Sequence, residues 1–152
     1  MDINTAHPLI TQATFPGDEE KKQIVADAGG WLTIVCHSLA MNAGWWIDPA
    51  TNQDVRTWPP HLLKLWVGTK IALIHSEASE ALEGHRKDRM DDHLPDVKQI
   101  EAELADVVIR VFDLAGGLGF NLGETIVKKL VFNATRPDHK LANRAAEGGK
   151  AY

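Results

Sequence analysis

Residues 74–82, IHSEASEAL, and residues 103–111, ELADVVIRV, indicate most clearly how this chain folds. In both stretches apolar residues recur at the three- and four-residue spacing of an α-helix. Each stretch also carries two carboxylates three positions apart, so each pair lies on one face of its helix. The charged residues 88–95, DRMDDHLP, separate the two stretches and predict the connector of a helical hairpin.

The rest of the chain extends the helical pattern. Asp18 is a plausible N-cap before an apolar-periodic segment that stops at Gly44. The tryptophan-containing loop 45–60 follows, and we expect its indoles to pack over the bundle end or a partner subunit. No strand pattern and no internal repeat compete. The predicted helices are residues 18–43, 60–87, 96–115 and 122–135. The sequence therefore predicts one all-α domain over residues 1–152, a four-to-five-helix bundle with its catalytic helices at about 60–136 and a polar tail at 138–152.

Composition excludes several classes of partner. The chain has 152 residues, 44% of them hydrophobic, and a formal net charge of −5, so neither nucleic acid nor an anionic membrane is an expected partner. The single cysteine, Cys36, rules out an intrachain disulfide and fits a reducing compartment. Residues 1–10 do not resemble a signal peptide, and no apolar run approaches the roughly 20 residues of a membrane span. We expect a cytoplasmic protein.

The two carboxylate pairs are level across the predicted hairpin. Glu80 lies seven residues before Lys87, and Glu103 lies seven residues after Asp96. At 1.5 Å per residue each pair is about 10 Å from its own end of the hairpin. Glu77 and Glu80 can therefore converge with Glu103 and Asp106.

Four carboxylates set among apolar residues would repel each other and would be costly to bury. A bound divalent cation relieves both penalties. All-oxygen ligation favours Mg²⁺, with Mn²⁺ as a substitute. The alternative is that these acids are solvated residues on two amphipathic helices.

A polar stripe near the C-terminus suggests the substrate. Lys129, Asn133, Arg136 and Lys140 fall at i, i+4, i+7 and i+11, and form one line if the helix extends that far. Three cations and an amide suit a polyphosphate chain, because arginine can hold phosphate oxygens bidentately. A solvated basic face is the alternative interpretation.

The E-x-x-E, 22 residues, E-x-x-D arrangement resembles the signature of the MazG-type all-α nucleoside triphosphate pyrophosphohydrolases. The likeness runs from about Lys70 to the C-terminus, through HSEASEALEG, ELADVVIRVFDLAGGLG and KLVFNATRPDHK, which look like segments of small bacterial and phage members. Phe132 stands where that family is expected to have a tyrosine. The residues that match the family's magnesium ligands are Glu77, Glu80, Glu103 and Asp106, and those that match its K-x-x-x-N-x-x-R segment are Lys129, Asn133 and Arg136.

The resemblance implies hydrolysis of a nucleoside triphosphate to the monophosphate and pyrophosphate. Water attacks the α-phosphorus, a site glutamate such as Glu80, or else Glu77, accepts its proton, and Lys129, Arg136 and Lys140 neutralise the leaving group. The resemblance also implies a homodimer or homotetramer. We expect it in the cytoplasm of a bacterial cell or, for a phage-encoded protein, in the cytoplasm of the host. The aromatic residues favour a large base, and a purine deoxynucleotide such as dGTP is the expected substrate.

Other classes fit less well. A di-iron bundle needs Glu-x-x-His pairs, which the histidines do not supply, and an HD-type phosphohydrolase needs an adjacent His-Asp pair. Cys36 and His37 are neighbours in a helix and point about 100° apart, so they are not a catalytic dyad; His37 lies near a base in our interpretation. The alternative that stays open is a helical nucleotide-binding or regulatory module without turnover.

Overall fold

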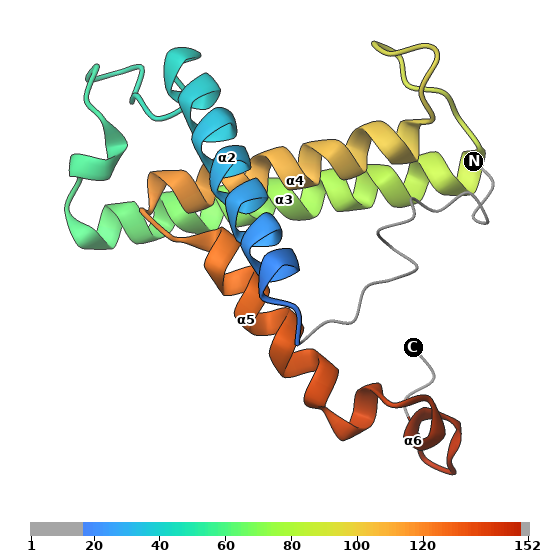
Figure 1. Ribbon diagram of the computed structural model, residues 1–152. Coiled ribbons are helices and arrows are strands. Elements are labelled where there is room, and N and C mark those ends of the chain that lie inside the picture. Colours follow the sequence, from blue (N-terminus) through green and yellow to red (C-terminus); the bar gives the residue numbers. More distant parts are fainter. Residues whose placement is uncertain (1–16, 150–152) are drawn as a thin grey trace. The chain divides into compact units, whose positions relative to one another are not determined.

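The computed structural model describes residues 17–149, and these residues are helical without any strand. Isolated bridges join Ile47 to Asp54 and Met90 to Lys98. The all-α prediction is confirmed (Figure 1). The expectation about a signal peptide at residues 1–10 lies outside the described residues. The elements are α2 (Glu19–Asn42), η2 (Val55–Thr57), α3 (Pro60–Lys87), α4 (Gln99–Gly117), α5 (Leu122–Thr135), η3 (Pro137–His139) and α6 (Leu141–Ala145).

The described residues divide into two compact units. One unit contains residues 17–30 and 122–149, and the other contains residues 31–121. The boundary falls inside α2, directly after its Gly29-Gly30 pair. The two units are described separately below, and the single domain over residues 1–152 stays a prediction.

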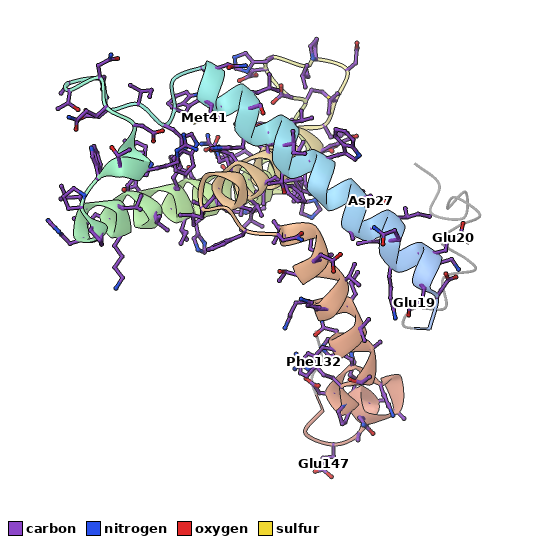
Figure 2. The ribbon with its side chains drawn as sticks, turned by 60° about the vertical axis from the view of Figure 1, so that its left-hand side comes forward. Glu19, Glu20, Asp27, Met41, Phe132 and Glu147 are labelled. Carbon is purple, nitrogen blue, oxygen red and sulfur yellow. The ribbon has the colours of Figure 1, made fainter. Side chains whose placement is uncertain are left out.

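Helix α2 begins and ends where its sequence predicts. The Asp18 carboxylate accepts the backbone N–H of Lys21 at 3.1 Å, which satisfies one of the free donors of the first turn. Acidic Glu19 and Glu20 follow (Figure 2), where negative charge is favourable against the helix dipole. The helix stops before Gly44, whose φ of 80° is costly for any residue with a Cβ.

By length and composition alone α2 is apolar enough to cross a membrane, contrary to the expectation that no apolar segment approaches the length of a span. Its mean hydropathy over an 18-residue window is 1.4. This is weak support for a membrane span, because core helices of soluble proteins meet the same criterion. In this helix His37 is hydrogen-bonded to a buried carboxylate, which does not fit a lipid environment.

The unit of residues 31–121 is built on a hairpin of α3 and α4, which lie side by side (Figure 1). Its core includes Cys36, Trp46, Val55 and Phe112. Trp46 is completely buried within this unit, so of the two places expected for the indoles it occupies the one over the helix ends and not a partner subunit. Gly117 allows the approach, since a Cβ there would lie 2.1 Å from the Trp46 ring.

The connector of the hairpin is longer than predicted, and α4 begins at Gln99 rather than at Asp96. Backbone pairing between Met90 and Lys98 takes these residues out of the helix. The Asp91 carboxylate accepts the backbone N–H groups of His93 and Leu94 at 2.9 and 2.7 Å. A local side-chain-to-backbone turn therefore competes successfully with the first turn of the helix.

The other unit brings the first half of α2 against α5. The backbones meet at Gly29 and Gly123, where a Cβ on Gly29 would lie 2.6 Å from the Cα of Gly123. Close packing therefore occurs at Gly29, whereas a Cβ on Gly30 would meet nothing within 4 Å. Helix α5 has the predicted bounds, and it ends before Arg136, whose backbone is extended at φ −68° and ψ 129°.

Candidate metal centre

The register of the α3–α4 hairpin is fixed at both ends. Near the connector, Gly84 faces Gln99 so closely that a Cβ on the glycine would lie 2.9 Å from the Gln99 Cβ. Near the far end, Lys70 Nζ pairs with Asp113 Oδ2 at 3.0 Å. Four residues inward from the first contact are Glu80 and Glu103, and seven residues inward from the second are Glu77 and Asp106. The two carboxylate pairs are therefore level.

Three of the four predicted ligands come together. Each of Glu77, Glu80 and Glu103 offers a carboxylate oxygen, and these oxygens all lie within 4.8 Å of one another. Glu77 and Glu103 are buried, with 7% and 8% of their surface exposed, whereas Glu80 is exposed. Asp106 is exposed, is not part of this group, and lines an adjoining cavity.

The electrostatics of the three carboxylates favour a cation. Burial raises the pKa of Glu103, and the nearby charges of Glu80 and Glu77 raise it further, against a hydrogen bond from the Gln99 amide. Arg110 donates to Glu77 Oε1 at 2.6 Å. Within residues 17–149 no salt bridge matches the charges of Glu80 and Glu103. A hard divalent ion fits this donor set, because the site offers oxygen atoms alone and an excess of negative charge.

The exposed member of the group is held in place by a neighbour. The Ser76 hydroxyl donates to Glu80 Oε1 at 3.1 Å, one turn earlier on α3. Glu80 is therefore oriented without being neutralised, which suits a residue that accepts a proton.

The predicted substrate stripe lies in the other compact unit, so its relation to the carboxylates stays a prediction. Lys129 and Asn133 are on α5, but Arg136 and Lys140 lie beyond its end, and the continuous helical line is not present. Pro137 accounts for this break, because a residue before proline is driven out of the α conformation. The Arg136 guanidinium instead donates to Asp138, with Nε 2.9 Å from Oδ1. The side-chain oxygen of Asn133 is buried and has no hydrogen-bond partner among the described residues.

A second polar cluster, centred on Asp113, was not recognised as a site from the sequence. Asp113 Oδ1 accepts from the Trp46 indole at 2.7 Å and from His37 Nδ1 at 3.0 Å, while Oδ2 accepts from Lys70. Since Nδ1 of His37 faces a carboxylate and Nε2 lies 3.3 Å from an Arg56 nitrogen, we assign the proton to Nδ1. These residues are 43 to 76 positions apart from Asp113, so no local pattern signals the cluster.

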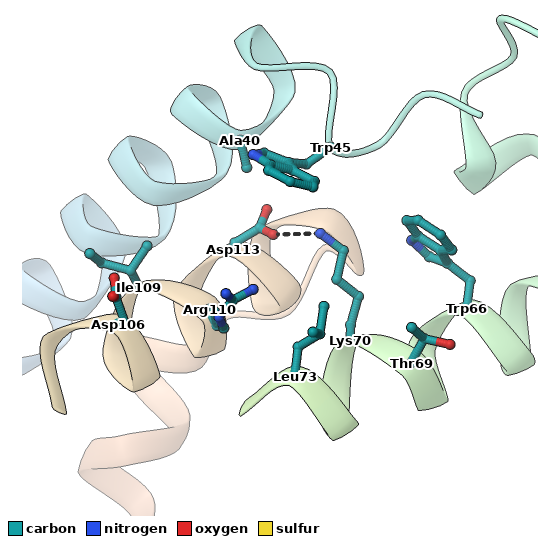
Figure 3. Close-up of a pocket in the computed structure, with 10 residues that line it drawn as sticks. All are labelled: Ala40, Trp45, Trp66, Thr69, Lys70, Leu73, Asp106, Ile109, Arg110 and Asp113. Atoms are coloured by element: carbon teal, nitrogen blue, oxygen red, sulfur yellow. Dashed lines mark hydrogen bonds and ion pairs between the residues drawn. The ribbon is translucent and has the colours of Figure 1, made fainter. Parts of the chain in front are cut away.

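The same unit contains a cavity of about 280 Å³ beside the carboxylates (Figure 3). Lys70 and Asp113 meet in the middle of this view, and Asp106 and Arg110 lie to their left, Arg110 being the partner of Glu77. Its other lining residues are Ala40, Trp45, Trp66, Thr69, Leu73 and Ile109.

Cys36 is buried, and burial raises the pKa of its thiol, followed by the charge of Asp113. A thiol held protonated in this way is a poor nucleophile, so Cys36 is a core residue here.

Comparison of the chain with models of known protein families finds no match, and neither do comparisons with curated proteins or with solved structures. The likeness to the MazG-type enzymes therefore depends on the motifs alone.

Proposed function

We propose that this protein is a magnesium-dependent nucleoside triphosphate pyrophosphohydrolase, which converts a nucleoside or deoxynucleoside triphosphate to its monophosphate and pyrophosphate. This proposal is based on the convergence of Glu77, Glu80 and Glu103 from two facing helices. Glu77 and Glu103 are buried, and the Arg110 guanidinium contacts Glu77. The motif resemblance supplies the reaction class. Both features are expected of an enzyme that binds a metal–polyphosphate complex.

Glu77, Glu80 and Glu103 would hold the ion, and Asp106, which lies on α4 three residues after Glu103, stays the fourth proposed ligand from the sequence. When bound, Mg²⁺ supplies positive charge to phosphate oxygens and lowers the pKa of a bound water. Arg110 fixes the Glu77 carboxylate through its 2.6 Å contact.

Glu80 is the proposed general base, because its side chain is exposed to solvent and its carboxylate is oriented by the hydrogen bond from the Ser76 hydroxyl. A water oxygen bonds to the α-phosphorus as the bond to the bridging oxygen of pyrophosphate breaks. The water proton passes to Glu80, and the electron pair leaves with pyrophosphate. Lys129, Asn133, Arg136 and Lys140 are assigned to the triphosphate from the sequence, and for this role Arg136 must release Asp138.

The test is pyrophosphate release from the common dNTPs and NTPs, with Mg²⁺, with Mn²⁺ and with EDTA. We expect monophosphate and pyrophosphate from at least one substrate when metal is present. Glu80→Gln should lower kcat by about 100-fold or more while keeping its helical content. Glu83→Gln is the matched control, since Glu83 lies on the same helix and pairs with Lys87 outside the cluster.

Unchanged turnover in Glu80→Gln would remove Glu80 from the mechanism. Absence of turnover with either metal, together with thermal stabilisation by nucleotides, would favour the binding or regulatory module.

The assembly is proposed to be a homodimer or homotetramer in the cytoplasm. Large apolar side chains are exposed on the helices of residues 31–121, which is unusual for a monomer in water. They include Trp31, Leu32, Ile34, Val35, Leu39, Leu65, Ile71, Leu82, Leu104, Val108 and Ile109.

A further inference from the structure

The cavity beside the carboxylates is bounded by two indoles. Trp45 and Trp66 stand on different sides of it, and Lys70 lies between them in the close-up (Figure 3). Leu73 and Ile109 add apolar surface. Aromatic surface on two sides of a cavity is suited to contact with a planar aromatic ligand. A volume of about 280 Å³ is at the low end for ligand pockets and fits one ring system rather than a whole nucleotide.

At the Lys70 end of this cavity the Asp113 acceptors are already used, whereas the donors are not; the remaining carboxylate of the lining, Asp106, lies at the end toward the metal-ligand candidates. Asp113 accepts three hydrogen bonds, from Trp46, His37 and Lys70. An ammonium has three N–H groups, and in residues 17–149 the hydrogen bond of Lys70 is the one to Asp113. Two of its N–H groups therefore remain for a ligand.

Lys70 is also held firmly. Its side chain is 13% exposed, and its Nζ lies 4.7 Å from the centre of the Trp46 ring and 5.8 Å from that of Trp66. Arg110 Nε and Trp66 Nε1 are buried donors without a partner in the described residues, and both residues line this cavity. The free polar groups of Lys70, Trp66 and Arg110 are donors, so this end of the cavity should select ligands that present acceptors.

The cavity is placed at the right distance from the carboxylates. Lys70 precedes Glu77 by seven residues on α3, and Asp113 follows Asp106 by seven on α4, about 10 Å in each helix. A nucleotide whose phosphates reach the carboxylate group would have its base at this cavity.

We propose that the cavity binds a 6-oxopurine base, with the two remaining N–H groups of Lys70 donating to O6 and N7. This inference rests on the proposed function, and it names guanine and hypoxanthine nucleotides as the substrate class. Lysine commonly reads the O6 and N7 edge of guanine. Adenine presents an amino group at position 6, which faces the ammonium as a second donor. In pyrimidines the one comparable pair of neighbouring acceptors, O2 and N3 of cytosine, lies beside the sugar.

The first test uses nucleosides without metal, so that it does not depend on catalysis. Quenching of tryptophan fluorescence reports binding of deoxyguanosine, deoxyinosine, deoxyadenosine, thymidine and deoxycytidine. We expect deoxyguanosine and deoxyinosine to bind about tenfold more tightly than deoxyadenosine, and 7-deazadeoxyguanosine, which lacks the N7 acceptor, to bind more weakly than deoxyguanosine. Equal binding of deoxyguanosine and deoxyadenosine, or a preference for pyrimidines, would overturn the proposal without involving any variant.

The second test uses Lys70→Met. It should remove the preference for 6-oxopurines, both in nucleoside binding and in kcat/KM for dGTP against dATP. Lys64→Met, an exposed position on the same helix, is the matched control and should keep the preference. A preference that survives in folded Lys70→Met would overturn the assignment of Lys70.

The two proposals fail separately. Metal-dependent turnover with no discrimination between dGTP and dATP would contradict the base assignment and leave the pyrophosphohydrolase standing. Selective binding of 6-oxopurines with no turnover would contradict the enzyme and leave the base assignment standing.

Discussion

Glu103 is a buried carboxylate whose neighbours carry the same charge, and this arrangement is unfavourable without a cation. Glu103→Gln should therefore stabilise the metal-free protein by about 1 kcal/mol, a rise in Tm of roughly 3 °C. Wild-type protein should gain about 2.7 kcal/mol at a free Mg²⁺ concentration of 100 times its Kd, and the variant should lose most of that gain. Calorimetry with and without Mg²⁺ measures both effects, with Glu101→Gln on the exposed face of α4 as the control.

The same residue predicts a dependence on pH. The pKa of Glu103 is higher in the folded chain than in the unfolded chain, so in the range upward from the ordinary glutamate pKa of about 4.3 the native state binds more protons. Its contribution to the free energy of unfolding therefore falls as pH rises through that range, while stabilisation by Mg²⁺ increases. Since other carboxylates such as Asp88 have lowered pKa values and act in the opposite direction, the quantity to measure is the difference between wild type and Glu103→Gln. A difference that does not vary with pH would contradict this account.

At the residue scale the sequence predicts the carboxylates better than their surroundings. Glu77, Glu80 and Glu103 were found because helical spacing and hairpin register are local properties. Asp113 is a polar residue on an apolar helix, but its partners Trp46 and His37 are far away in sequence. Whether these side chains meet depends on how the 17-residue connection between α2 and α3, residues 43–59, packs. The periodicity of apolar residues gives no information about that packing.

At the scale of elements, boundaries were predicted where a residue enforces them. Pro60 opens α3, Gly44 follows α2, and α5 has the expected length. The start of α4 was misplaced because the Asp91 turn and the pairing of Met90 with Lys98 are interactions within the connector. Pro137 predicts the break at Arg136, because the residue before a proline is disfavoured in a helix. The expectation of one continuous stripe did not take this effect into account.

The close approach of α2 and α5 requires Gly29 and Gly123, whereas a Cβ on Gly30, beside Gly29, would make no such contact. Gly29→Ala should destabilise the protein by about 1–3 kcal/mol, because its Cβ would meet the Gly123 backbone, which cannot give way like a flexible side chain. Gly30→Ala is the matched control: nothing lies within 4 Å of its Cβ, and alanine should stabilise the helix by up to about 1 kcal/mol. Urea unfolding of the two variants measures the difference, and equal stabilities would mean that the helices do not cross here.

At the scale of the whole molecule, the unit of residues 31–121 exposes many large apolar side chains, whose contact with water is unfavourable. Leu65 is 70% exposed and Leu39 is 63% exposed, and both lie on long helices rather than in loops. A second copy of the chain is the proposed cover, as the motif resemblance also implies.

Sedimentation of the protein at micromolar concentrations should therefore give the mass of a dimer or a tetramer. Leu65→Glu should shift this equilibrium toward smaller species, because a carboxylate in an apolar interface is costly to desolvate, while the helical content stays unchanged. Leu94→Glu makes the same change at an exposed position of the connector, and it should leave the mass unchanged. A wild-type monomer at all concentrations would require another cover for these helices, and the apolar character of α2 would then make lipid vesicles the next partner to test.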